Sequence, residues 1–496
     1  MHLLKYFMIL IFVTGFNLSA QIGVRKSFQL GMESNSAGQT FLGNGVVDLL
    51  SGKNSIWAAT GYGLNASYDQ GKSWKIFTSN EYKGKGGVSA IGFMDDSTLW
   101  IATAFDTTAQ GEDLSAGGGL SYTRDGGLTW THIKQPVDSR DVSEYSPTTT
   151  VVQNLTFDFA FIDSTIWIAS YGGGLRRSDD MGQSWQVVTT DGHPFSSFDY
   201  LSHRGFSLLA ENGNLWYGSA EGISKSTDNG QTWQRFMHAN QEYPISGNFV
   251  VALAYQEATH TVWAATVEAV NEGEVRAVSK TTNGGLTWQV VLKGIFAHNF
   301  GFDDESVFVA ADEGLFISED SGENWYKAPP VVDSQSGEEI LSNEFYSAAS
   351  QVSGNTSRWW LGSSDGLATT TDRGNTWQVV RSFVSTRERT KPKVYAYPSP
   401  FSPSRSGYTR FQYNVDDGSG RVLDTNDDIE IKIYNFAMEH VVTIRDDKTG
   451  FRSETGDFST KWDGKDSVGK LVASGVYFFR ARIGNEVSWG KVVVIN

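Results

Sequence analysis

Seven carboxylate or carboxamide side chains recur at one spacing in this sequence, each inside the same kind of octet. The octet opens with Ser or Thr, has Asp or Asn at its third position and Gly at its fifth, and closes with Trp. Its third position is filled by Asp69, Asp125, Asp180, Asp228, Asn283, Asp320 and Asp372. Such groups can serve as general acids, as calcium ligands, or as acceptors for backbone N–H groups in a turn.

The number of copies favours the last of these roles. One reaction needs one set of catalytic groups, whereas a repeated architecture needs the same turn in every unit. Asp or Asn can accept N–H bonds across such a turn, Gly can take a positive φ, and the closing Trp can bury its ring against a neighbouring sheet. We therefore interpret the octet positions as structural, and we assign no catalytic residue and no metal site.

Short strands must position each octet. The octet at residues 178–185, for example, follows strand-like runs at 156–162 and 166–168 and precedes another at 186–188. With the run that leads into the octet, each unit holds four short strands. Seven such units predict a seven-bladed β-propeller. The expected fold class is all-β, a seven-bladed β-propeller followed by a small immunoglobulin-like β-sandwich.

The octets resemble the Asp-box, or bacterial neuraminidase repeat, of sialidases, xyloglucanases, sortilin-type receptors and the photosystem-assembly propellers related to Ycf48. This resemblance implies the propeller fold but no single activity, because the superfamily contains both glycoside hydrolases and binding proteins. Its sialidases normally have six blades and an Arg-Ile-Pro segment near the start, which this chain lacks. Its xyloglucanases place two catalytic Asp between tandem propellers, and this chain is long enough for one propeller.

The connections between strands differ in length, which indicates where a ligand would bind. Octets and short connections such as residues 95–97 are expected at one rim, and the variable connections, including residues 135–150 and 189–204, at the opposite rim. Insertions are tolerated in solvated loops, where binding residues accumulate. The candidate ligand-binding residues of that rim are Tyr82, Asp106, Asp113, Arg140, Glu144, Tyr145, His193, Phe195, Phe198, Tyr200, Arg204 and Tyr243.

Two functions remain open at this rim. We favour a binding protein for an extracellular glycan or protein, and the alternative is an extracellular glycoside hydrolase of sialidase-like or xyloglucanase-like type. A hydrolase would need two carboxylates across a groove. They would come from Asp106, Glu112, Asp113, Asp138, Asp141, Glu144 or Asp199. His193, His203 and His238 lack metal-ligand spacing, so no metal and no cofactor is expected.

The last hundred residues follow a different pattern. The repeat stops after Trp377, residues 385–393 are a charged linker, and strand-like runs continue through residues 394–496. This region resembles the FlgD-type immunoglobulin-like domain and type IX secretion sorting tails, which implies a role in export or surface attachment and the secretion machinery as a partner. The segments that carry the resemblance are YPSPFSP at 397–403, IKIYN at 431–435, WDGKD at 462–466, SGVYF at 474–478 and KVVV at 491–494. Residues 424–428 (DTNDD) favour a solvated acidic turn over a calcium loop.

Composition restricts the partners and the compartment. The net charge of -16 argues against nucleic acid and anionic membranes as partners, and the absence of Cys excludes disulfides and thiolate sites.

Residues 1–20 read as a signal peptide, with Lys5 before an apolar run at 6–16 and a small Ala20 at the cleavage point, although an uncleaved anchor is the alternative. We expect a propeller at residues 21–384 in a secreted or cell-surface protein without a transmembrane segment in its mature chain.

Overall fold

The computed structural model describes most of the chain after its first 40 residues. It describes residues 41–109, 111–139, 144–145, 149–335, 337–353, 356–382, 394–404, 407–414, 429–445, 457–483 and 486–496. The expected signal peptide, the linker at 385–393 and the acidic turn at 424–428 lie outside these residues. Strands dominate the described part, and none of its helices is long and apolar enough to cross a membrane.

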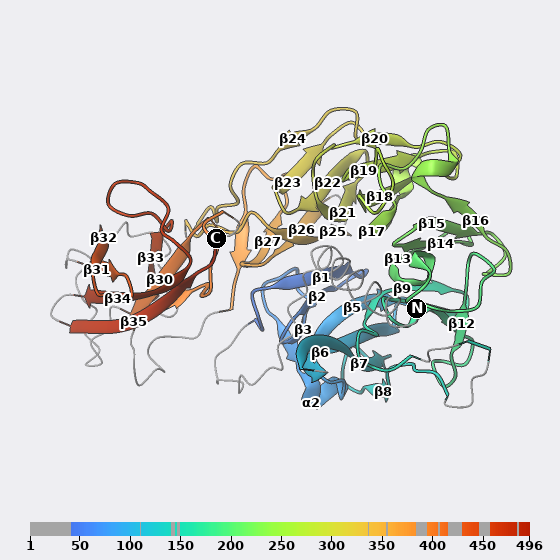
Figure 1. Cartoon of the computed structure of the whole chain (residues 1–496), viewed down its shortest axis with the longest axis horizontal. Coiled ribbons are helices and arrows are strands. Elements are labelled where there is room, and N and C mark those ends of the chain that lie inside the picture. Colours follow the sequence, from blue (N-terminus) through green and yellow to red (C-terminus); the bar gives the residue numbers. More distant parts are fainter. Residues whose placement is uncertain are drawn as a thin grey trace, which may run out of the picture.

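Seven four-stranded antiparallel sheets follow one another along the chain, and Figure 1 shows them arranged in a ring. In each sheet the strands lie in sequence order. The first four blades are β1 (Val46–Ser51), β2 (Ile56–Thr60), β3 (Gly63–Ser67) and β4 (Lys75–Phe77); β5 (Gly87–Phe93), β6 (Leu99–Ala109), β7 (Glu112–Thr123) and β8 (Thr131–Ile133); β9 (Thr156–Ile162), β10 (Thr165–Ser170), β11 (Gly174–Ser178) and β12 (Gln186–Val188); and β13 (Gly205–Glu211), β14 (Asn214–Ser219), β15 (Gly222–Ser226) and β16 (Gln234–Phe236). The other three are β17 (Phe249–Gln256), β18 (Thr261–Val267), β19 (Ala277–Thr281) and β20 (Gln289–Val291); β21 (Ala297–Asp303), β22 (Ser306–Ala311), β23 (Gly314–Ser318) and β24 (Tyr326–Lys327); and β25 (Phe345–Ser353), β26 (Thr356–Ser363), β27 (Gly366–Thr370) and β28 (Gln378–Val380).

The first strands of the blades form the inner wall of the ring. Each contacts the first strand of the next blade, and β25 of the seventh blade contacts β1 of the first. The predicted seven-bladed β-propeller is therefore confirmed. Every octet begins at the last residue of a third strand and ends one residue before the fourth, as Ser178 and Trp185 do between β11 and β12.

Side chains close the ring. Each of the seven sheets consists of consecutive strands, so the described chain exchanges no strand between its first and last blades. Trp74 of the first blade packs edge-on against Trp360 of the seventh, with ring centroids 6.0 Å apart. The Ser347 hydroxyl donates to the Val46 carbonyl at 3.1 Å. Asn44 bonds the backbone of Ser382 twice, through its amide nitrogen at 2.9 Å and its oxygen at 2.6 Å.

In the described part of the chain, four short helices interrupt the connections. They are α2 (Ser79–Tyr82), η1 (Leu201–His203), η2 (His238–Asn240) and η3 (Glu257–Thr259). A capping box fixes the start of α2, where the Thr78 hydroxyl accepts from the Asn80 N–H and the Glu81 carboxylate accepts from the Thr78 N–H. A single helical turn of this kind has no periodicity that the sequence could show.

The C-terminal region is a separate pair of sheets. One sheet holds β29 (Tyr395–Tyr397), β30 (Thr409–Asn414) and β33 (Asp457–Trp462), and the other β32 (His440–Arg445), β31 (Ile429–Tyr434), β34 (Gly475–Ile483) and β35 (Glu486–Val494). Phe411 of the first sheet and Phe479 of the second meet in one core, so the region is a two-layer β-sandwich. Trp462 ends β33 and packs against Phe401 and Tyr477.

The three-stranded sheet of the sandwich contacts the seventh blade. Arg410 of β30 donates to the Glu339 carbonyl at 2.9 Å and lies 3.4 Å from the Asp365 carboxylate. Lys461 of β33 pairs with the Glu339 carboxylate at 2.6 Å. Arg381, buried beneath this contact, pairs with Asp365 at 2.8 Å. Figure 1 shows the sandwich beside the ring, with β30 and β33 nearer to it than β31 and β34.

Candidate functional site

The octet turns use their carboxylates internally. In the third blade, the Asp180 carboxylate accepts from the Ser178 hydroxyl at 2.8 Å and the Ser184 N–H at 2.9 Å. The Ser178 hydroxyl also accepts from the Gly182 N–H at 2.9 Å, with Gly182 at φ 80°. Asn283 makes the corresponding bonds in the fifth blade with its oxygen, and its amide nitrogen donates to the Thr287 hydroxyl.

These bonds keep the octet carboxylates ionised. In five octets, hydrogen bonds from the side chain and the N–H of the seventh octet residue lower the pKa of the Asp carboxyl group to about 2. These carboxyl groups are those of Asp69, Asp125, Asp180, Asp228 and Asp320. A carboxyl group with such a pKa holds almost no proton near neutral pH, which makes it a poor general acid.

The closing Trp of an octet packs on the preceding blade. Trp233 meets Trp167 with centroids 6.3 Å apart, and Trp325 meets Trp263 at 6.2 Å, both edge to face. We call this side of the propeller the octet rim. Because neighbouring strands are antiparallel, the connections between second and third strands and between blades leave from the opposite side, which we call the long-loop rim.

The structure brings six predicted site residues together on the long-loop rim, all from two linkers. They are Tyr145 of the linker before β9, and His193, Phe195, Phe198, Tyr200 and Arg204 of the linker before β13. The His193 and Tyr200 rings stack in parallel, 4.6 Å apart with an interplanar angle of 3°. His193 is exposed and Phe198 is 65% exposed. We call His193, Phe198 and Tyr200 the aromatic platform.

A buried set of polar bonds holds the loop that carries this platform. The Asp191 carboxylate accepts from the Ser202 hydroxyl at 2.6 Å and bonds His203 Nε2 at 3.0 Å. His203 Nδ1 accepts from the Ser196 N–H at 3.0 Å, so the ring proton lies on Nε2 and donates to Asp191. Burial raises the pKa of Asp191, but these bonds outweigh it and hold the pKa at about 2. Ser202 and His203 both bond the carboxylate rather than each other, so the set lacks the geometry of a catalytic triad.

Phe195 lies beneath the platform instead of on its surface. Its ring is 3% exposed and stacks on His203 at 5.5 Å and edge-on against Tyr145 at 5.3 Å. The Tyr145 hydroxyl donates to Asp138 at 2.9 Å, and Arg176 pairs with the same carboxylate at 2.7 Å. Burial raises the pKa of Asp138, but the Thr149 N–H and the Arg176 guanidinium lower it by more. The pKa of Asp138 is therefore below its ordinary value. Phe195 and Asp138 therefore support the loops and do not face a ligand.

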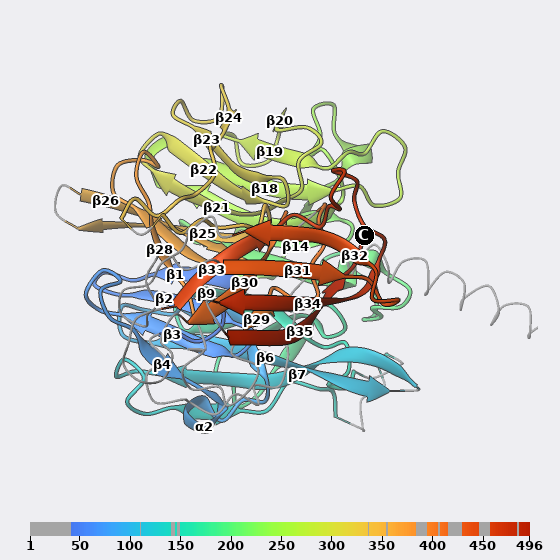
Figure 2. The same ribbon diagram turned by 90° about the vertical axis from the view of Figure 1, so that its left-hand side faces the viewer.

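Asp106 and Asp113 lie on another element, the long β6–β7 hairpin. Asp106 accepts from Ser115 at 3.0 Å and Asp113 from Thr108 at 2.9 Å, so the two cross-strand pairs share one face. Burial, and to a smaller extent the Asp113 charge, raises the pKa of Asp106, and the Ser115 bond opposes this. Figure 2 shows this hairpin projecting beyond the other blades.

Two predicted residues lie away from the long-loop rim. Tyr82 is completely buried, donates to the Gly86 carbonyl and packs on Trp130, because α2 lies along the outer edge of the second blade. Tyr243 is 58% exposed, but its carbonyl accepts from the N–H of Trp288, the closing residue of an octet. Glu144 is exposed on the rim, and Arg140 lies outside the described residues.

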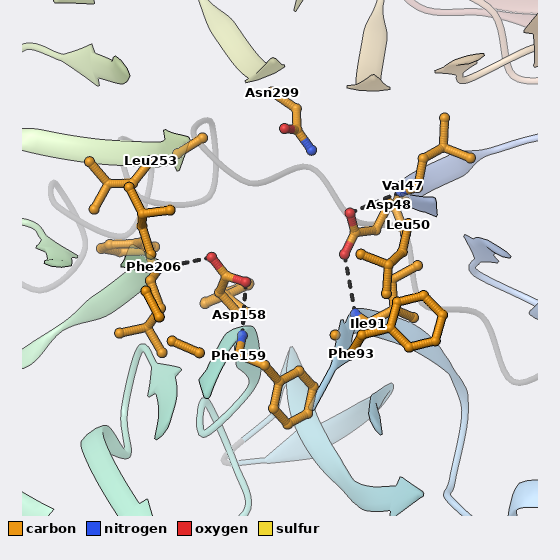
Figure 3. A pocket seen from close by; sticks show the side chains of 18 of the residues that line it. Val47, Asp48, Leu50, Ile91, Phe93, Asp158, Phe159, Phe206, Leu253 and Asn299 are labelled. Carbon is orange, nitrogen blue, oxygen red and sulfur yellow. Dashed lines mark hydrogen bonds between the residues drawn. The ribbon is translucent and has the colours of Figure 1, made fainter. Parts of the chain in front are cut away.

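A central cavity of about 550 Å³, which was not predicted from the sequence, is lined by the first strands of the blades. Asp48 and Asp158 face each other across it, with Asn299 between them at a third side (Figure 3). Asp48 accepts from the N–H groups of its neighbour Leu49 and of Ile91 in the next blade, at 2.9 and 3.2 Å. Asp158 likewise accepts from the N–H groups of its neighbour Phe159 and of Leu208 in the next blade.

Asp48 and Asp158, the two carboxylates of the central cavity, connect adjacent blades. Asp48, Asp158 and Asn299 each follow a β-bulge in a first strand. A lone polar residue in an apolar run, as in VVDLLS at residues 46–51, was the available signal for them. Within the described residues no three His, Asp or Glu side chains are grouped so as to hold a metal ion.

Comparisons with known proteins support the fold. No family model matches the sequence, and no curated protein matches it. A GH74 xyloglucanase from Xanthomonas campestris is similar in structure, with a TM-score of 0.51 and 13% identity over 94% of this chain and 75% of that one. A GH74 enzyme from Niastella koreensis gives a TM-score of 0.50 and 13% identity over 95% and 75%.

A third similar structure is PorZ, described as an essential surface component of the type IX secretion system of Porphyromonas gingivalis. It has a TM-score of 0.47 and 16% identity over 94% of this chain, and this chain spans 61% of PorZ. At 13% identity the two GH74 likenesses establish architecture and leave activity open. Together with the closed ring of seven sheets, they show that the chain is a β-propeller protein.

Proposed function

We propose that this protein is an exported or cell-surface binding protein whose propeller holds a carbohydrate or protein ligand on its long-loop rim. The observation that carries the proposal is the aromatic platform of His193, Phe198 and Tyr200, in which His193 and Phe198 are exposed to solvent and Tyr200 stacks on His193. Flat aromatic faces with a polar handle stack on sugar rings and anchor protein partners. The residue identities leave both ligand classes open.

The platform is held rigidly before a ligand arrives. Arg204 Nε donates to the Ser197 carbonyl at 2.7 Å, and its Nη2 donates to the Phe198 carbonyl at 3.3 Å. With the buried Asp191 set below, these bonds fix the loop backbone on both sides of the exposed rings. A preformed loop loses less conformational entropy on binding, so more of the contact energy contributes to affinity.

The hydrolase alternative is supported by one observation, the raised pKa of Asp106 beside Asp113. A general acid with a raised pKa is what glycoside hydrolysis requires. Asp138 pairs with Arg176, and Asp199 accepts a hydrogen bond from the Ser196 hydroxyl at 2.7 Å. Neither therefore suits the role of the second catalytic carboxylate beside Asp106. Release of reducing sugar by the wild type and its loss in Asp106→Asn would establish the hydrolase and displace the binding function.

We propose that the regions outside the propeller deliver and retain it. In this proposal residues 1–20 are a signal peptide, residues 21–384 the propeller, residues 385–393 a linker and residues 394–496 an immunoglobulin-like domain of the FlgD type that serves sorting or surface attachment. The two-layer sandwich is compatible with such a domain. Truncation after Lys391 should leave a protein that is no longer exported to the surface, and unchanged surface retention would refute the sorting role.

A glycan array and a pull-down of surface proteins with the mature chain test the ligand site. We expect ligand retention by the wild type and at least a tenfold loss in the double variant His193→Ala, Tyr200→Ala. Tyr243→Ala is the matched control, because Tyr243 is an exposed aromatic residue away from the platform. Equal binding by the double variant and the wild type would place the ligand elsewhere.

A further inference from the structure

The outer face of the four-stranded sheet in the sandwich carries exposed aromatic rings. Along β34 the side chains of Tyr477, Phe479 and Ala481 are buried in the core, so those of Phe478 and Arg480 point outward. On the neighbouring β35, Trp489 lies opposite Arg480 and is 47% exposed. The Tyr434 ring of β31 lies 5.8 Å from the Trp489 ring. Large aromatic side chains gathered on a solvent-facing sheet are uncommon without a partner.

The same face concentrates positive charge. Among the described residues, its outward positions include Lys432, Arg445, Arg480, Arg482 and Lys491, together with the carboxylate of Glu430, which pairs with Lys432 at 3.3 Å. Residues 1–393 carry 27 Lys and Arg against 42 Asp and Glu, whereas residues 394–496 carry 13 against 14. Five of the 13 cations of this nearly neutral domain therefore lie on one face, and the domain is attached to an acidic propeller.

Part of this arrangement costs stability. Lys432 and Arg480 are direct cross-strand partners on β31 and β34. Like charges directly opposite each other in a sheet are destabilising. Within the described part of the chain, no carboxylate pairs with Arg480 or Lys491. An anionic ligand over this face would neutralise the repulsion.

The face is directed away from the propeller. The other sheet of the sandwich makes the contact with the seventh blade, through Arg410 and Lys461. Figures 1 and 2 show β31, β34 and β35 on the side of the sandwich that is remote from the ring. We call Lys432, Tyr434, Phe478, Arg480, Trp489 and Lys491 the distal face.

We propose that the distal face binds an anionic polysaccharide. The flat aromatic rings of Trp489 and Tyr434 suit stacking on sugar rings, and Arg480 and Lys491 beside them suit carboxylate, phosphate or sulfate groups on the same chain. A duplex nucleic acid fits less well, because its dense phosphates would also meet the field of the acidic propeller. Binding at the distal face does not depend on the ligand of the long-loop rim.

The site should discriminate polymers by charge. In affinity electrophoresis at 0.15 M salt, the mature chain should be retarded by polygalacturonate and much less by its fully methyl-esterified form, which has the same backbone without the charge. We expect Trp489→Ala to weaken retardation at least tenfold, and Arg480→Gln with Lys491→Gln to remove the difference between the two polymers. Retardation by polygalacturonate should also fall as salt rises, because the cations are exposed and screened.

Matched controls come from the same domain. Lys470 and Leu471 are exposed on a turn away from the distal face, so Lys470→Gln and Leu471→Ala should bind like the wild type. His193→Ala with Tyr200→Ala should also leave this binding unchanged, which separates it from the proposed propeller site. Melting temperatures close to that of the wild type will show that each variant is folded.

Three outcomes would overturn the proposal. The first is equal retardation by the charged and esterified polymers, and the second is undiminished binding in Trp489→Ala. The third is stronger binding to vesicles of anionic phospholipid than to polygalacturonate, which would assign the distal face to a membrane surface.

Discussion

The two rims of the propeller use the same types of side chain in opposite ways. On the octet rim, the Asp or Asn at the third position bonds the first hydroxyl and the seventh N–H of every octet, so these oxygens bond the turn that contains them. On the long-loop rim the connections between blades differ in length, and aromatic rings such as Phe198 are left exposed. Repetition therefore marks the residues that build the ring, and irregularity marks the residues available to a ligand.

This comparison predicts how stability is distributed. A substitution on the octet rim removes or distorts a contact between blades, so its effect should reach the whole ring. A substitution of an exposed platform residue removes contacts with solvent and should change binding alone. Variants on the two rims test this difference.

Gly230→Ala should be the most destabilising. Gly230 is the fifth residue of an octet, has φ 84°, and an added Cβ would lie 2.4 Å from the Trp167 ring of the preceding blade. Left-handed strain and overpacking together should lower the free energy of unfolding by about 3 kcal/mol. Urea unfolding of the mature chain measures this change.

Gly213→Ala is the matched control for that variant. Gly213 lies on the same rim of the same blade with φ 79°, but a Cβ there would meet nothing within 4 Å. Only the backbone strain remains, and it should cost about 1 kcal/mol. Equal losses in the two variants would show that contact between octet and blade does not stabilise the ring.

The second prediction concerns the charge of the octet Asp. Asp180→Ala should lower the melting temperature by a few degrees at pH 7, because the Ser178 and Ser184 donors lose their acceptor. Asp180→Asn should lower the melting temperature less, since Asn283 makes corresponding bonds in the fifth blade. Melting curves of both variants at pH 7 give the comparison.

The pH dependence of the same variants has a fixed sign. The folded-state pKa of Asp180 is about 2, below its ordinary value of 3.8, so its ionised form stabilises the fold above pH 4. That contribution is lost as pH falls from about 4 to about 2. The difference between wild type and Asp180→Asn should shrink over this range, and Asn283→Asp should gain such a dependence. A difference that stays constant with pH would exclude ionisation as the source.

The sequence predicted the ring well because its signals are local and repeated. The octet contains its own hydrogen-bond donors and acceptors, so its spacing alone indicated the turns, the strands on either side and the number of blades. Inner strands such as β9 (Thr156–Ile162) were predicted with their observed limits, since their apolar runs end at turn residues.

The site could be predicted only in part. The linker before β13 was identified as a binding loop from its length and aromatic residues, but those properties do not tell an exposed ring from a buried one. Tyr82 and Phe195 were therefore placed on the surface, although the first is buried against Trp130 and the second against His203 and Tyr145. Asp48 and Asp158 were missed because the β-bulges that turn them into the channel depend on pairing between strands.

Phe198→Ala should have the smallest effect on stability. Its ring is 65% exposed, so its loss should change the free energy of unfolding by at most about 0.5 kcal/mol. Phe195→Ala in the same loop removes a ring that is 3% exposed and stacked on His203, and should cost about 3 kcal/mol. Urea unfolding of the two variants, together with ligand binding, separates the roles. If Phe198→Ala destabilised the protein as much as Phe195→Ala, the platform would be part of the packing of the long-loop rim, and the contrast between the rims would fail there.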